Sequence, residues 1–427
     1  MELREKLNFI LRETNPWWKA GSFTIKGYCE RDIYPAITKF LSLPQIIALV
    51  GLRRTGKTTM MLKVIEEHCS KIPPANILYF SFDDFSELDL EDLLNAYRGI
   101  HPEINLDEGR FLFCFDEIQK LRSWTDKIKK IYDRHKNIKI LVSGSESLFL
   151  RKDIKESLGG RIFEFRVNQL NFVEYLAFSR RQDFLAKPEL YQNEILSALR
   201  IYMKINGFPE LVNVTDEMVI RKYLKETVVD KILYKDIPQL FRVRNTGVLS
   251  EILDLIMFQP GQIIDVARLS KELGLSRQAV ASYLDYLEKA FLIRKLYNFS
   301  RNLRKQKRAL KKYYPAIVFA QTVEDKFALC FENILVWQLD AQFFYRDAYK
   351  NEVDIVLAGE QKDIMPVEVK TGDVDLKGLR VFMQKNGLEQ AVVVTIDKSG
   401  QRDGVTLVPF WKYLKNVRDK NAAAWRE

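Results

Sequence analysis

The stretch GLRRTGKTT at residues 51–59 constrains the fold of this chain more than any other feature of its sequence. The apolar run QIIALV at 45–50 precedes it, and apolar residues at helical spacing follow it. It matches the pattern G-x-x-x-x-G-K-[ST] through Gly51, Gly56, Lys57 and Thr58. A buried strand, a tight loop and a helix in this order predict a phosphate-binding loop in an α/β fold with a layered sheet.

The residue types in this loop suit a nucleoside triphosphate. Glycines let backbone N–H groups converge on phosphate oxygens without a clash from Cβ, and the helix amino terminus adds partial positive charge. Lys57 can reach the β- and γ-phosphates, and the Thr58 hydroxyl can bind Mg²⁺. We expect ATP to contact Gly51, Arg53, Arg54, Thr55, Gly56, Lys57, Thr58 and Thr59.

An acidic pair follows the apolar run RFLFCF at 110–115. A carboxylate at the carboxyl end of a strand can face the phosphates and hold Mg²⁺, a role that falls to Asp116. The adjacent Glu117 is placed to orient and deprotonate an attacking water. The alternative is that the two acids only end a strand or cap the next helix.

Two further residues are candidates for contact with the γ-phosphate. Ser143 ends the run IKILVSG at 138–144 and could lie between the two phosphate elements, or belong to a simple turn. Arg161, in LGGR, could act from the same chain or from a neighbouring subunit, or pair with a nearby acid.

Residues 269–296 predict a helix-turn-helix followed by a wing, in which Ser276 caps the second helix. Arg277, Gln278 and Ser282 are candidates for DNA contact, whereas Leu284 and Leu287 belong to the core. Domain packing or protein contact is the alternative role of such a module.

A basic stretch adjoins the predicted wing. It holds seven cations and no acid in twelve residues: Arg301, Arg304, Lys305, Lys307, Arg308, Lys311 and Lys312. Such a cluster can neutralise nucleic-acid phosphates, and the nearby Tyr297, Phe299, Tyr313 and Tyr314 could stack on bases or belong to the core. A solvated charge run is the alternative.

The carboxyl-terminal part carries Asp354, thirteen intervening residues, and then Glu368-Val369-Lys370. Alternation along a strand places Glu368 and Lys370 on one face, with Asp354 beside them on a paired strand. Two carboxylates can hold Mg²⁺ or Mn²⁺, and the lysine can stabilise charge at a phosphate. The alternative is a chance pattern in a charged hairpin.

These motifs together resemble the AAA-type ATPases of archaea and bacteria that carry a carboxyl-terminal domain formerly of unknown function. The resemblance spans roughly 30–400 and rests on GLRRTGKTT, FDEIQK, LVSGSESL, LGGR, INGFPEL, LYKDIP and the EVDIVL…VEVK pair. It implies a P-loop ATPase core over 1–167, a helical lid over 168–245, a winged helix over 246–315 and a PD-(D/E)xK nuclease-like domain over 316–427. It also implies that Glu332 joins the nuclease-like acids as a catalytic residue.

Composition narrows the setting. The net charge of +10 permits contact with nucleic acid. Four scattered cysteines and three scattered histidines argue against a disulfide framework and a His-ligated metal site. No apolar run approaches the roughly 18 residues that a membrane span needs, and no signal-peptide pattern opens the chain, so we expect a cytoplasmic protein without a membrane partner.

The sequence thus predicts a Mg²⁺-dependent ATPase that couples nucleotide state to DNA binding and to possible cleavage or remodelling, in a possible homo-oligomer. One alternative is a regulatory NTPase switch that acts on protein partners and carries an inert nuclease-like module. Another is a DNA clamp that binds ATP without hydrolysis, although Glu117 argues against it.

Overall fold

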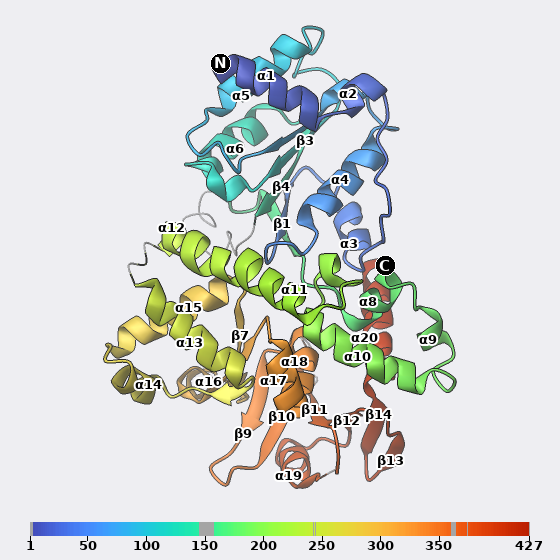
Figure 1. The fold of residues 1–427 in the computed structure, drawn as a ribbon, viewed down its shortest axis with the longest axis vertical. Coiled ribbons are helices and arrows are strands. Elements are labelled where there is room, and N and C mark those ends of the chain that lie inside the picture. The colour runs from blue at the N-terminus through green and yellow to red at the C-terminus, as the bar shows by residue number, and fades with distance from the viewer. Residues whose placement is uncertain are drawn as a thin grey trace. The chain divides into compact units, whose positions relative to one another are not determined.

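The computed structural model describes residues 3–144, 158–241, 243, 245–359, 364–373 and 375–426. The chain divides into two compact units, Met1–Asn168 and Gln169–Ala424, and each has a β-sheet of its own (Figure 1). Residues 145–148 of the LVSGSESL motif lie outside the described residues.

A parallel sheet with strand order β2-β3-β4-β1-β5 forms the centre of the first unit. Its strands are β1 (Ile46–Val50), β2 (Ile77–Ser81), β3 (Phe111–Asp116), β4 (Ile138–Gly144) and β5 (Ile162–Arg166). Every residue of β1 and β3 is buried, as expected for parallel strands covered on both faces. The α/β fold with a parallel sheet is therefore confirmed, and the loops after β1, β3 and β4 meet at one edge.

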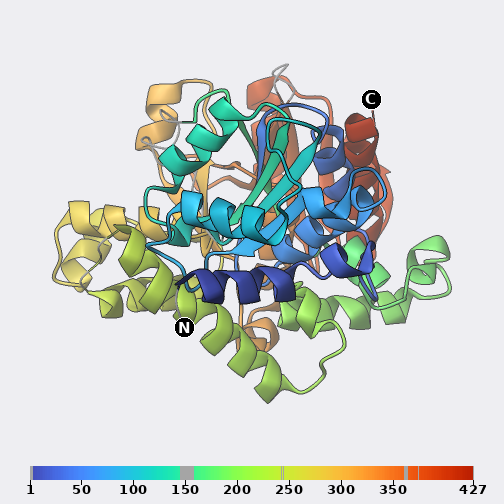
Figure 2. The same ribbon diagram turned by 90° about the horizontal axis from the view of Figure 1, so that it is seen from above.

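Helices surround this sheet (Figure 2). They are α1 (Leu3–Thr14), α2 (Trp17–Ala20), α3 (Tyr34–Lys39), α4 (Lys57–His68), α5 (Leu90–Ile100) and α6 (Trp124–Arg134), with short 3₁₀ turns at Pro74–Asn76 and Ile118–Lys120. Met61 and Val64 of α4 share one buried core with Leu49 and Leu141 of the sheet. This packing holds the amino terminus of α4 against the end of β1.

The second unit begins with helices. They are α8 (Phe172–Phe178), α9 (Asp183–Ala186), α10 (Gln192–Ile205), α11 (Glu217–Lys222) and α12 (Ile237–Phe241), with a 3₁₀ turn at Pro209–Leu211 and π-helical turns at Tyr223–Val229 and Ile232–Asp236. An Asn171 capping box starts α8, because its side chain accepts from the Glu174 N–H while Glu174 reaches back. The helical expectation for this stretch agrees with the described residues.

Four helices and three short strands follow: α13 (Thr246–Phe258), β6 (Gln262–Ile263), α14 (Val266–Glu272), α15 (Arg277–Lys289), β7 (Ile293–Asn298), α16 (Leu303–Arg308) and β8 (Lys311–Pro315). Ser276 caps α15 as expected, since its hydroxyl accepts from the Ala279 N–H at 3.1 Å. Leu284 and Leu287 are buried. Arg277 and Gln278 are exposed at the start of α15, and Ser282 is partly exposed.

The remaining elements are α17 (Ala320–Asp325), α18 (Phe327–Gln338), β9 (Phe343–Arg346), β10 (Glu352–Ala358), β11 (Ile364–Lys370), α19 (Lys377–Asn386), β12 (Ala391–Thr395), β13 (Gly400–Arg402), β14 (Val405–Pro409) and α20 (Phe410–Arg426). One nine-stranded sheet joins β13-β14-β12-β11-β10-β9-β7-β8-β6. The parallel pairing of Tyr297 with Phe343 connects β7 to β9, so a single sheet crosses the module boundary expected at 315/316.

Candidate functional site

The loop after β1 has the backbone that its glycines predict. Gly51 and Gly56 have φ values of 146° and 95°, in the region that favours glycine. A Cβ atom on Gly51 would lie 2.3 Å from the Val167 carbonyl oxygen, so no larger residue fits there. The loop packs tightly against the end of β5, and α4 begins directly after it at Lys57.

Lys57 is buried within the loop. Its ammonium donates to the carbonyl oxygens of Leu52 at 2.7 Å and Gly51 at 3.1 Å. The carbonyls hold the charge at the centre of the loop, where a phosphate oxygen would compete for the same donors. Thr55 is also buried, and its hydroxyl donates to Leu52 at 3.0 Å, which gives it a role in shaping the loop.

Asp116, at the carboxyl end of β3, connects the neighbouring strands to α4. One carboxylate oxygen accepts from the Thr58 hydroxyl at 2.6 Å and from the Tyr79 hydroxyl at 3.0 Å. The other accepts from the Ser143 hydroxyl at the end of β4. The hydroxyl of Thr58 and the carboxylate of Asp116 are both hard oxygen ligands, and they fit Mg²⁺.

Glu117 takes a left-handed conformation, with φ of 51°. Its N–H donates to the Ser143 hydroxyl at 3.2 Å, and its carboxylate accepts from the Gln119 amide at 2.5 Å. Burial raises the pKa of Glu117; the Asp116 charge adds to the rise, while Lys57 and Arg53 oppose it. A carboxylate whose pKa moves toward neutrality suits a general base.

The other predicted loop residues differ in their exposure. Arg54 has a φ of 63°, and its side chain is exposed. Thr59 is exposed on the first turn of α4, whereas Arg53 is partly buried and lies close enough to influence Glu117. The structure thus brings Lys57, Thr58, Asp116, Glu117 and Ser143 together at one edge of the sheet.

Arg161 lies elsewhere. It immediately precedes β5, which runs parallel to β1, so it occupies the amino edge of the sheet. The loop lies at the carboxyl edge, about 16 Å away along the five-residue strand. The Arg161 guanidinium contacts Asp133 at 3.1 Å. The prediction that Arg161 contacts the γ-phosphate of its own chain is therefore corrected, and within the chain Arg161 forms an ion pair instead. Contact with a neighbouring subunit stays a prediction.

Arg31 and Tyr79 belong to the site although the sequence did not predict them. The Arg31 guanidinium donates to the carbonyls of Thr55 at 2.9 Å and Asn168 at 2.8 Å, which joins the loop to the chain after β5. No motif signals this contact, because Arg31 is 24 residues from Thr55 in a segment of irregular spacing. For Tyr79, a polar ring in the apolar run NILYFSF was the available signal.

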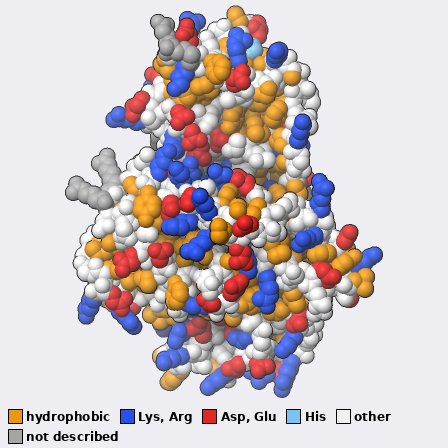
Figure 3. All heavy atoms as spheres, viewed as in Figure 1, with side chains coloured by type: hydrophobic (Ala, Val, Ile, Leu, Met, Phe, Trp, Pro, Cys, Tyr) orange, Lys and Arg blue, Asp and Glu red, His pale blue; other side chains and the backbone are white. Residues whose placement is uncertain are grey.

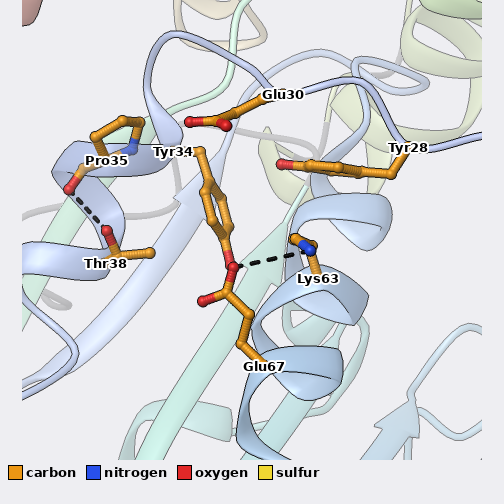
Figure 4. A pocket seen from close by; sticks show the side chains of 7 residues that line it. All are labelled: Tyr28, Glu30, Tyr34, Pro35, Thr38, Lys63 and Glu67. Carbon is orange, nitrogen blue, oxygen red and sulfur yellow. Dashed lines mark hydrogen bonds and ion pairs between the residues drawn. The ribbon is translucent and has the colours of Figure 1, made fainter. Parts of the chain in front are cut away.

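A hollow of about 520 Å³ lies beside α4 (Figure 4). Tyr34 points its hydroxyl at Glu67, and Lys63 approaches the same carboxylate at 3.9 Å. Burial raises the pKa of both Tyr28 and Tyr34, with Glu30 and Glu67 adding to the rise. Both phenols therefore stay protonated, and the two carboxylates offer acceptors to a ligand with N–H groups.

In the second unit, the D…ExK residues meet as their spacing predicts. The β10–β11 register pairs Ile355 with Val367, which places Asp354 opposite Glu368. Asp354 accepts from the Val369 N–H at 2.8 Å, and Lys370 donates to Glu368 at 2.7 Å. The three side chains therefore share one face of neighbouring strands.

Glu332 reaches the same cluster from α18. Tyr314 donates its hydroxyl to Glu332, and the Lys312 ammonium contacts Glu332 at 3.2 Å and Glu352 at 2.6 Å. Lys312 is buried in β8, so it is not a surface cation of the basic stretch. Tyr313 and Tyr314 are buried as well, which rules them out as exposed stacking surfaces.

Burial raises the pKa of Asp354 well above its ordinary value, and the charges of Glu332 and Glu368 raise it further. Burial also raises the pKa of Glu368, against the effect of Lys370. Where the structure describes the chain, no group of three or more His, Cys, Asp or Glu residues is arranged to hold a metal ion. The carboxylates bind Lys312, Lys370 and backbone N–H groups in this arrangement.

The comparisons with known proteins match three segments. Residues 43–176 match an AAA domain, while residues 196–316 and 328–413 match two domains of unknown function, DUF8612 and DUF4143. The uncharacterized proteins MJ1544 and MJ1637 of Methanocaldococcus jannaschii are 28% and 24% identical to this chain. These alignments cover 86% and 87% of this chain, and 88% and 84% of the relatives.

Similar solved structures include Cdc6p from Pyrobaculum aerophilum, with 12% identity and a TM-score of 0.29 over 71% of this chain and 92% of that one. The Hsp104–ADP complex of S. cerevisiae has 16% identity and a TM-score of 0.31 over 65% of this chain and 41% of that one.

Among the described helices, none combines the length and apolar character needed to cross a membrane. The AAA match and the geometry around Lys57 agree: the chain carries an AAA-type P-loop ATPase core.

Proposed function

We propose that this protein hydrolyses ATP with Mg²⁺ and couples the nucleotide state of its first unit to DNA handled by its second unit. The observation that carries the hydrolytic part is the convergence of Lys57, Thr58, Asp116 and Glu117 at one sheet edge. Bound Mg²⁺ would supply charge neutralisation at the β- and γ-phosphates. Thr58 and Asp116 would hold it.

Side chains and backbone groups of the protein have the remaining roles in binding and hydrolysis. Lys57 and the loop N–H groups bind the phosphates, and Ser143 orients both Asp116 and the backbone of Glu117. Glu117 accepts a proton from the attacking water, for which its raised pKa suits it. Gln119 holds the Glu117 carboxylate in place.

The hollow in Figure 4 is our proposed site for the nucleobase. Lys63, on its wall, lies six residues after Lys57, or roughly 9 Å along α4, which suits the distance from phosphates to a base. Glu30 and Glu67 are acceptors for the exocyclic amine of adenine. Glu30→Gln replaces one of these carboxylates with an amide and should change the affinity ratio of ATP to GTP, measured by competition, because the amines of adenine and guanine lie at different positions on the base.

The DNA part of the proposal is supported by the exposed Arg277 at the start of α15 and by the basic helix α16. The helices α13, α14 and α15 with the β7–β8 hairpin are compatible with a winged helix, and the Asp354, Glu368 and Lys370 arrangement with a PD-(D/E)xK nuclease. The experiment is ATP turnover with and without duplex, single-stranded and branched DNA. Cleavage is followed in parallel with Mn²⁺ and an Asp354→Ala control.

Lys312 favours a second candidate function. Its buried ammonium neutralises Glu332 and Glu352 beside the proposed nuclease acids, where it would oppose the entry of a metal ion. The chain would then be a regulatory NTPase switch with an inert nuclease-like module. Slow ATP turnover that no DNA stimulates, with no DNA cleaved, would select this candidate.

A further inference from the structure

A second cavity, of about 650 Å³, lies in the second unit between the end of β7, helix α16, the β9–β10 turn and the end of α19. Its size is that of a small-molecule site. Four cationic side chains line it: Arg301, Lys305, Arg346 and Lys385. Lys and Arg side chains also project from the lower end of the molecule in Figure 3, where Figure 1 places β9 and α19.

The one carboxylate among the described residues of the cavity wall is already engaged. Asp347 accepts from the N–H groups of Tyr349 and Asn351, each at 2.9 Å, and from the Asn351 amide at 2.8 Å. These bonds shape the β9–β10 turn and lower the pKa of Asp347. The cavity therefore has a positive balance and suits an anion.

Aromatic rings give the cavity a second character. Tyr349 is 89% exposed, an unusual position for a large ring, and it stands on the turn that closes one side. Phe299 and Tyr345 lie deeper, and the Lys385 ammonium donates to the Tyr345 hydroxyl at 3.0 Å. An exposed ring next to cations suits a planar base that carries a phosphate.

The cavity also connects to the carboxylate cluster through ion pairs. Arg346 contacts Glu352 at 3.1 Å, Glu352 contacts Lys312 at 2.6 Å, and Lys312 contacts Glu332. A ligand phosphate at Arg346 would thus be linked to Lys312 through the single carboxylate of Glu352. We infer that this cavity binds a nucleoside 5′-phosphate, either the end of a nucleic-acid strand or a free mononucleotide.

The inference rests on the proposed DNA function only where it names the end of a nucleic-acid strand as a source of the ligand. Its test therefore measures binding and requires neither DNA cleavage nor ATP turnover. The probes are a fluorescent ten-residue oligothymidylate with a 5′-phosphate, the same strand with a 5′-hydroxyl, and thymidine 5′-monophosphate. Binding is measured on the full chain carrying Lys57→Ala, which silences the ATP loop. We expect a preference for the phosphorylated strand of about tenfold or more.

Two matched double variants each remove two cations near α16. Arg301→Ala/Lys305→Ala changes the cavity wall, whereas Arg304→Ala/Lys307→Ala changes neighbouring side chains outside it. The first should abolish the preference for the 5′-phosphate, and the second should lower both affinities while keeping their ratio. Tyr349→Ala should weaken both strands about fivefold or more, because a stacked base is lost.

Binding of the monophosphate that Arg301→Ala/Lys305→Ala removes would support a free nucleotide as the ligand. Binding of the phosphorylated strand alone would support a strand end. If the two double variants changed the affinity ratio of the 5′-phosphate strand to the 5′-hydroxyl strand equally, the inference would be overturned. The cations would then attract the strand without a specific contact to its 5′-phosphate. Failure of all three probes to bind would overturn it too, whereas ATP turnover without DNA stimulation would weaken only the proposed function.

Discussion

At the scale of single residues, the structure gives the proposed catalytic roles separate tests. Glu117 combines an oriented backbone, a held carboxylate and a raised pKa. Asp116 instead accepts three hydroxyl hydrogen bonds, which suits a metal ligand better than a base. The two adjacent acids therefore have different roles because of their surroundings, although the sequence FDE treats them alike.

Glu117→Gln should retain ATP binding and lower kcat by about a hundredfold or more, since glutamine keeps the shape but accepts no proton. Because a base must be deprotonated and the pKa of Glu117 is raised, wild-type kcat should fall as pH decreases, starting above the usual carboxyl range. A pH series of steady-state turnover measures both effects. Full turnover in Glu117→Gln would refute the role, and Glu91→Gln, on the exposed first turn of α5, is the matched control.

Lys312→Met should destabilise the second unit by about 3 kcal/mol, because the largely buried Glu332 would lose the ammonium that contacts it, whereas Glu352 would keep its ion pair with Arg346. Lys307→Met, on exposed α16, should change stability by less than about 0.5 kcal/mol. Chemical denaturation followed by fluorescence gives both values. Equal stability of the two variants would contradict the buried ion-pair cluster.

At the scale of elements, α16 is the clearest case of a segment placed by its neighbours. Asn302 caps it by accepting from the N–H groups of Arg304 and Lys305, and it sits between β7 and β8. The cationic side chains of α16 are therefore exposed. The residues that follow α16 form β8, in which Lys312 is buried. Four of the seven cations, Arg304, Lys305, Lys307 and Arg308, therefore lie on an exposed helix, whereas Lys312 lies in a buried ion-pair cluster.

Replacing Arg304, Lys305, Lys307 and Arg308 with alanine should flatten the salt dependence of DNA binding. Each phosphate that the variant no longer neutralises should reduce the slope of log affinity against log salt by roughly 0.9 for a duplex. Titrations at four salt concentrations measure this slope. A quadruple variant with the wild-type slope would show that α16 takes no part in binding.

At the scale of the whole molecule, the position of Arg161 decides between two ways of activating the ATP site. In its own chain it contacts Asp133 at the sheet edge opposite the loop. A role at the γ-phosphate therefore requires a second subunit. In that case a mixture of Arg161→Ala and Glu117→Gln chains should recover part of the activity that each lacks alone.

Activity of the mixture at several ratios, together with the molecular mass in solution, checks this prediction. Recovery that peaks near equal proportions supports action between subunits. A fully active monomer at the assay concentration excludes it. Asp133→Ala serves as the control, because it breaks the ion pair within the chain without removing the arginine.

The sequence alone predicted three strands of the first sheet, which end at the loop around Lys57, at Asp116 and at Ser143, and it predicted the pairing of Asp354 with Glu368. These features depend on local pattern: apolar runs form buried strands, glycines permit unusual φ values, and alternation places side chains on one face. For the same reason Ser276 as a cap and Leu284 as a core residue could be recognised. Ser143 could be predicted as a residue of the ATP site because it lies at the end of a strand.

Only the tertiary structure decided what depends on contacts between distant segments. Arg31 joins the loop to Asn168, Arg161 falls at the far edge of the sheet, and Lys312 leaves the basic stretch for a buried cluster. Strand order and register set these positions, and they emerge when separate segments share one core. Residue type and spacing in a single chain carry no record of strand order, so no local pattern could have supplied it.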